Sequence, residues 1–108
     1  MHRGDIVTVA APGDYGKPRP AVVIQGDVLN RDATSTILAL ITSHLRDAPL
    51  LRLTIEPSRE NGLKVRSQVQ INRLLSVPVE KVGCAVGRLS DQQIAELNRL
   101  LALVIGLA

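Results

Sequence analysis

The chain has 108 residues, of which 45% are apolar and 21% charged. This balance fits one globular domain over residues 1–108. No apolar run approaches the roughly 20 residues of a membrane-spanning helix, and the opening residues, MHRGD, are not followed by the apolar region of a signal peptide. We therefore expect a cytoplasmic protein with no membrane partner. A lone Cys84 excludes an internal disulfide, and two histidines leave little for a zinc site, so we expect no metal or cofactor.

Positive charge is concentrated in the middle of the chain. The formal net charge is +3, and six basic but only three acidic residues lie between Arg46 and Arg73. This suits an anionic partner such as a nucleic acid or an acidic peptide, although a solvated face of mixed charge gives the same pattern. The chain has no Phe or Trp and one Tyr. RNA would therefore be held mainly by arginines and backbone groups rather than by stacking.

Short β-branched and apolar runs predict five or six strands, at residues 5–11, 20–25, 35–44, 50–55, 65–71 and 82–88. Residues 12–14 form the expected first turn, and residues 26–34 and 56–63 are expected loops. The segment 65–71, VRSQVQI, alternates, which places Gln68 and Gln70 on the face opposite Val69 and Ile71. Cys84 is flanked by Gly83 and Ala85, and we expect a buried, inert thiol there.

A single helix is predicted after Ser90, which forms a capping-box pattern with Gln93. Apolar residues recur at helical spacing as far as Val104, and Gly106 is a natural stop. Its last turns are apolar on every side, so a barrel end or a second copy of the chain should cover them. The sequence thus predicts a mainly β protein with a C-terminal helix, built as a small, strongly bent sheet or barrel.

Searches for common catalytic motifs fail: the chain has no GxxxxGK[ST], GxGxxG, GxSxG or HExxH, and no evident pair of catalytic carboxylates. One constellation does stand out. RGDIV at residues 3–7 is followed by KPRPAVVI at 17–24, then by QGD at 25–27, NR at 30–31 and ITS at 41–43. This order resembles the MazF/PemK family of toxin endoribonucleases, and the resemblance extends more weakly through SQV at 67–69 to the C-terminal helix.

The resemblance implies an SH3-like barrel with a C-terminal helix, acting as a homodimer. It implies metal-independent, sequence-specific cleavage of single-stranded RNA, in which the RNA's own 2′-hydroxyl attacks to leave a 2′,3′-cyclic phosphate and a 5′-hydroxyl. Such an enzyme supplies neither nucleophile nor metal, and needs only to orient the strand, move protons and stabilise charge. The resemblance also implies a cognate antitoxin with an acidic, disordered tail.

By position in the motif, the resemblance assigns catalytic roles to Arg19 and Thr42. Arg19 is a poor base, so we expect it to stabilise phosphate charge. Without the resemblance, the alternative for Arg19 is a surface arginine in a proline-bounded loop, and Thr42 would mainly be interpreted as an ordinary strand threonine. If the strand runs on to His44, that imidazole shares a face with Thr42 and could transfer a proton or contact phosphate. The alternative is a solvent-facing histidine.

Further RNA contacts are expected from seven polar residues in or near the segments that carry the resemblance: Tyr15, Lys17, Gln25, Asn30, Ser43, Gln70 and Asn72. The chain departs from the family at Asn72, which replaces an acidic residue, and at Leu75, which replaces an arginine. Asn72 can hydrogen-bond a base edge but cannot act as a base. Two other functions remain open: a CcdB-like, non-enzymatic poison of DNA gyrase on the same scaffold, and a regulatory nucleic-acid-binding barrel.

Overall fold

The computed structural model describes residues 1–13 and 15–108. Asp14, which belongs to the expected first turn, lies outside the described residues. The elements, in chain order, are β1 (Asp5–Ala10), β2 (Pro18–Val23), α1 (Asp27–Asn30), β3 (Ser35–Thr42), β4 (Arg52–Ile55), β5 (Ser67–Pro78), η1 (Val79–Lys81), β6 (Ala85–Arg88) and α2 (Asp91–Val104). The expected mainly β architecture with a C-terminal helix is therefore confirmed.

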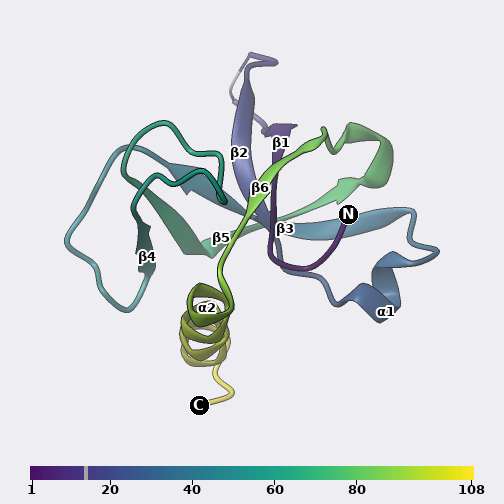
Figure 1. Ribbon diagram of the computed structural model, residues 1–108. Coiled ribbons are helices and arrows are strands. Elements are labelled where there is room, and N and C mark those ends of the chain that lie inside the picture. Colours follow the sequence, from purple (N-terminus) through teal and green to yellow (C-terminus); the bar gives the residue numbers. More distant parts are fainter. Residues whose placement is uncertain (14) are drawn as a thin grey trace.

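The six strands form one antiparallel sheet in the order β4-β5-β3-β2-β1-β6. The sheet curls into a partly open barrel, with α2 at one end (Figure 1). The first and last strands lie side by side, since β1 pairs with β6 from Asp5 opposite Arg88. Their side chains form an ion pair at 3.4 Å.

Apolar side chains fill both faces of the sheet. One cluster includes Ile6, Ile41 and Ile71, and α2 closes it with Leu97 and Leu100. The second cluster occupies the other face, with Val7, Val23, Leu38, Leu40 and Val77 among its members. Because both faces are covered, strand residues of either parity are buried. This explains why Gln68 and Gln70, predicted on the face opposite Val69 and Ile71, are only 6% and 7% exposed.

The longest strand, β5, differs most from the prediction. It was expected at residues 65–71 but spans Ser67–Pro78. Its register against β3 shifts between Ile41, which pairs with Val69, and Ala39, which pairs with Leu74. A bulge of β5 therefore bends the strand, so that its first part also pairs with β4 and its second part pairs with β3 alone in the described sheet.

Four smaller predictions were also wrong. Strand β2 begins at Pro18 rather than residue 20, and β3 ends at Thr42 rather than residue 44. The expected loop at 26–34 contains the single-turn helix α1. Cys84 is exposed because it lies in an irregular segment leading into β6, at the edge of the sheet.

The helix prediction is confirmed at its start. The Ser90 hydroxyl accepts from the Gln93 N–H at 3.1 Å, and the Gln93 side chain accepts from the Ser90 N–H at 2.9 Å. Past the C-cap, Gly106 has φ +81°. Within a single copy of the chain, the apolar C-terminal end of the helix is only partly covered. Leu100 is 1% exposed, whereas Ile105 is 57% exposed.

Candidate RNA-cleavage site

A cavity of about 650 Å³ opens between the start of β2, the end of β3 and the loop at residues 62–65. Four of the predicted site residues line it: Lys17, Arg19, Thr42 and Ser43. Lys64 also lines it, which the sequence analysis did not single out except as part of the basic middle of the chain. Three cationic side chains thus border one cavity, an arrangement suited to an anionic ligand.

Two prolines explain why the cavity lies at this place. Hydrogen-bonding direction alternates along a strand, and directly after β2 the Ile24 N–H donates to the Ile37 carbonyl of β3 at 3.0 Å. Pro20 and Pro18 occupy the positions of the same parity, where a nitrogen would face β3 but carries no hydrogen. The pairing of β2 with β3 accordingly ends at Ala21. Beyond that pair the cavity separates the two strands.

Arg19 and Thr42 come from these separating strand ends. Ala21 pairs with Leu40, and the same register continued by two residues puts Arg19 opposite Thr42. Both are on the face that carries Ala21 and Leu40, because side chains alternate with a period of two. The arginine is exposed and the threonine half-buried. The two residues assigned catalytic roles from the sequence are therefore brought to one site.

Thr42 is followed by a bend rather than by more strand. The His44 backbone N–H donates to the Thr42 hydroxyl oxygen at 3.0 Å. The premise that a continuing strand would place the imidazole beside Thr42 was wrong, because β3 ends at Thr42. His44 is exposed and is not among the residues that line the cavity.

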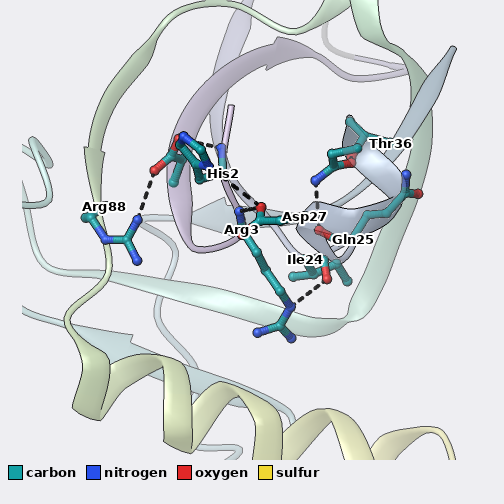
Figure 2. Close-up of polar contacts among 9 residues, drawn as sticks. His2, Arg3, Ile24, Gln25, Asp27, Thr36 and Arg88 are labelled. Atoms are coloured by element: carbon teal, nitrogen blue, oxygen red, sulfur yellow. Dashed lines mark hydrogen bonds and ion pairs between the residues drawn. The ribbon is translucent and has the colours of Figure 1, made fainter. Parts of the chain in front are cut away.

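Gln25 and Asn30 lie away from this cavity, beyond the far end of β2. The Gln25 side-chain amide donates to the Ser35 carbonyl at 3.2 Å, and the Gln25 backbone carbonyl accepts from the Asn30 side-chain amide at 2.8 Å. The Asn30 carbonyl oxygen in turn accepts from Thr36 at 2.8 Å. Figure 2 shows Gln25 and Thr36 beside α1. Through these hydrogen bonds, the side-chain amides of Gln25 and Asn30 hold α1 against β3.

The remaining predicted contacts are scattered. Tyr15 lies in the loop between β1 and β2, is fully exposed and has a φ of +53°. Asn72 is exposed at the bend of β5. Gln70 is buried, and its Nε2 has no hydrogen-bond partner within the described part of the chain. The structure therefore brings together the residues at 17–19 and 42–43 but not these three.

A second cavity, of about 330 Å³, lies over β4, the start of β5 and the loop at 45–49. It is lined by three arginines, Arg46, Arg52 and Arg66, and by the other residues of the loop at 45–49. Arg66 is also paired with Glu56 at 2.8 Å. The excess of basic residues between positions 46 and 73 indicated that these arginines could bind an anionic partner together. Nothing in the sequence indicated that they would lie near Thr42.

Residues 1–13 and 15–108 contain no cluster of three or more His, Cys, Asp and Glu side chains that could hold a metal ion. Over the same residues, no helix has the length and apolar character needed to cross a membrane.

Solved structures define the class of fold. The chain superposes on an endoribonuclease in complex with its cognate antitoxin from mycobacterial species with a TM-score of 0.85, at 17% identity, covering 100% of this chain and 97% of that one. It superposes on the Mycobacterium tuberculosis toxin MazF-mt6 with a TM-score of 0.83, at 22% identity, covering 96% and 98% of the two chains. The fold is thus that of the MazF toxins.

Sequence comparison then gives the family. The model of the PemK-like, MazF-like toxin of type II toxin–antitoxin systems matches residues 2–105. A probable endoribonuclease MazF of Mycolicibacterium smegmatis is 41% identical over 109 residues, covering 100% of this chain and 99% of the relative. The endoribonuclease EndoA of Bacillus subtilis is 22% identical over 111 residues, covering 99% and 96%. The chain belongs to the PemK/MazF toxin family, and the resemblance inferred from residues 3–43 is confirmed. These matches do not favour a CcdB-like poison of gyrase.

Proposed function

We propose that this chain is an endoribonuclease toxin that cuts single-stranded RNA at short sequences, with Arg19 and Thr42 at the cleavage site. The RNA-cleaving class follows from the family and from relatives named as endoribonucleases. The observation that carries the assignment of the site is the convergence of Arg19 and Thr42 on one cavity bordered by Lys17 and Lys64.

The chemistry fits these groups. The RNA 2′-hydroxyl attacks the adjacent phosphorus, the bond to the 5′-oxygen breaks, and the products are a 2′,3′-cyclic phosphate and a 5′-hydroxyl. Negative charge builds on the phosphoryl oxygens in the transition state, where a guanidinium can contact two of them at once. Arg19 supplies that contact, and the Thr42 hydroxyl donates a hydrogen bond to the same group. The reaction assigned to these residues uses no metal.

Lys17 and Ser43 flank this pair along the cavity, so we assign them to binding the RNA backbone. The exposed ring of Tyr15 offers a stacking surface. Contacts from Gln25, Asn30, Gln70 and Asn72 stay predictions. For His44 we propose that the backbone N–H acts on Thr42, in place of the proton transfer by the imidazole that the sequence analysis considered.

We also propose that an antitoxin with an acidic tail binds over the cationic cavity and excludes RNA. One solved structure of this fold holds its cognate antitoxin. An acidic segment would match the charges of Lys17, Arg19 and Lys64. The exposed apolar side chains Leu103, Ile105 and Leu107 at the end of α2 support a homodimer, because a second copy would cover them.

The decisive experiment is cleavage of a long, mixed-sequence RNA by the purified protein in EDTA. We expect discrete cuts with cyclic-phosphate ends, blocked by a 2′-deoxy nucleotide at the cut. The Arg19→Ala variant should lose cleavage. Arg31→Ala, at another exposed arginine, next to α1, should retain it. Uncut RNA with a folded wild-type protein would refute the proposal and direct attention to a gyrase supercoiling assay.

A further inference from the structure

Gln68 is a buried glutamine in the strand next to Thr42. It is 6% exposed, and it pairs with Thr42 of β3 on one side and with Thr54 of β4 on the other. Its carboxamide lies on the same face of the sheet as Thr42, since directly paired residues of antiparallel strands project to one face. A buried amide here needs partners, or it costs about 1–3 kcal/mol.

Every hydrogen-bonding position of this amide is used. The oxygen Oε1 accepts from the Arg46 backbone N–H at 3.0 Å and from Arg52 Nη1 at 3.0 Å. The nitrogen Nε2 donates to the Arg46 carbonyl at 3.0 Å and to the Thr54 hydroxyl at 3.1 Å. A primary amide has two acceptor and two donor positions. Gln68 is therefore saturated, and it could read a nucleotide base only by giving up one of these bonds.

Two further hydrogen bonds connect Gln68 to Thr42. Arg52 Nη1, held by Gln68, also donates to the His44 carbonyl at 3.2 Å. The backbone N–H of the same residue, His44, donates to the Thr42 hydroxyl oxygen at 3.0 Å. Gln68 and Arg52 thus fix the bend after β3 on both sides of residue 45.

This arrangement has a chemical consequence for the hydroxyl. A threonine hydroxyl has one proton to donate and two lone pairs to accept with. The His44 N–H occupies one lone pair, which restrains the rotation of the hydroxyl and leaves its proton for another acceptor. If the bend moved, the hydroxyl would lose this restraint while β3 itself stayed in place.

We propose that Gln68 is a positioning residue for RNA cleavage: with Arg52 it clamps residues 44–46, so that the His44 N–H holds the Thr42 hydroxyl as a donor toward the scissile phosphate. The inference rests on the proposed role of Thr42. It concerns a residue that does not touch RNA, so its loss should lower the chemical rate and leave RNA affinity nearly unchanged.

The test uses Gln68→Met, which keeps the size of the side chain and removes all four bonds. Gln92→Met, at an exposed position on α2, is the control and should match the wild type. In single-turnover cleavage we expect Gln68→Met to lower the rate about 10- to 100-fold, since a small misplacement of a catalytic group costs about that much. The Kd for a 2′-deoxy analogue should stay within about twofold.

A double-mutant cycle separates positioning from general loosening. In a Thr42→Val background, which lacks the hydroxyl, Gln68→Met should lower the rate no further. An equal additional loss in that background would overturn the proposal, as would a loss confined to RNA affinity.

Amide hydrogen exchange tests the clamp independently of activity. In the wild type the His44 and Arg46 amides should be protected, and Gln68→Met should expose both while the strand amides of Val22 and Ala39 keep their protection. Unchanged protection at His44 would overturn the clamp. Lost protection in a protein that never cuts RNA would support the clamp and refute only the proposed function.

Discussion

The backbone N–H of His44 lies 3.0 Å from the hydroxyl oxygen of Thr42, so the histidine contacts the candidate catalytic hydroxyl through its main chain. The imidazole itself is not among the groups lining the cavity. This separates two roles that the sequence alone could not distinguish, a proton-transferring side chain and a hydrogen-bonding backbone.

Substitution at His44 distinguishes the two roles. We expect His44→Ala to cleave RNA within about threefold of the wild-type rate and with the same pH profile, because the N–H remains. His44→Pro should be far slower, since proline has no N–H to donate. Rates measured from pH 5 to 9 check this. A His44→Ala variant that loses one limb of the profile would assign proton transfer to the imidazole.

Gln70 offers a test of stability and of RNA contact together. Its buried Nε2 has no partner among the described residues, which costs about 1–3 kcal/mol. Gln70→Met should therefore raise the free energy of unfolding by about 1 kcal/mol and raise the Tm by about 4–8 °C. Thermal unfolding measures the gain. Lower RNA affinity in the same variant would show that the amide finds its partner in the substrate, as the sequence analysis predicted.

Gly87 is required by close packing. A side chain there would overlap the backbone of Asn61 and Glu60, which belong to the loop that leads to the cavity. Gly87→Ala should destabilise the protein by about 1–3 kcal/mol, the usual cost of overpacking. The control is Gly26→Ala, where an added Cβ meets nothing within 4 Å and φ is −60°. Equal midpoints in urea for the two variants would contradict this account.

Glu96 and Arg99 form an exposed pair on α2, with Arg99 Nη2 at 2.6 Å from Glu96 Oε1. Hydrogen bonding to Arg99 lowers the pKa of Glu96, and the positive charge adds to the effect. The contribution of the lowered pKa to stability is therefore present above the unfolded pKa and is lost as the pH falls through the folded one. NMR titration of the Glu96 carboxyl should show Arg99→Gln raising its pKa. An unchanged value would show that the pair is broken in solution.

Much of the fold could be predicted because its signals are local. The capping box at Ser90 is contained in four residues, and the β-branched runs that form β1 and β3 are continuous in the sequence. The bulge in β5 could not be predicted. Residues 72–78 neither alternate nor form an apolar run, and they become strand only because β3 pairs with them.

The candidate site also contains residues that could be found from the sequence and residues that could not. Arg19 and Thr42 were found by resemblance, and the proline pair beside Arg19 has a physical reason that can be read from the sequence. The clamp at Gln68 could not be found, because Gln68, Arg52 and Arg46 lie on different segments and only the curled sheet brings them together. Alternation placed Gln68 on the face opposite Val69, but it gave no indication that this face is buried as well.

The pairing of β1 with β6 governs the order in which this chain can fold. Asp5 pairs with Arg88, which lies 83 residues further along the chain. The apolar cluster under the sheet is complete only when Leu97 and Leu100 of α2 pack into it. Contacts between such distant residues slow folding, because loop-closure entropy is lost before they form. On the ribosome the first strand therefore emerges long before the strand beside it has been synthesised. A nascent chain interrupted before residue 85 lacks β6 altogether, so β1 has no partner on that edge until residues 85–88 have been synthesised.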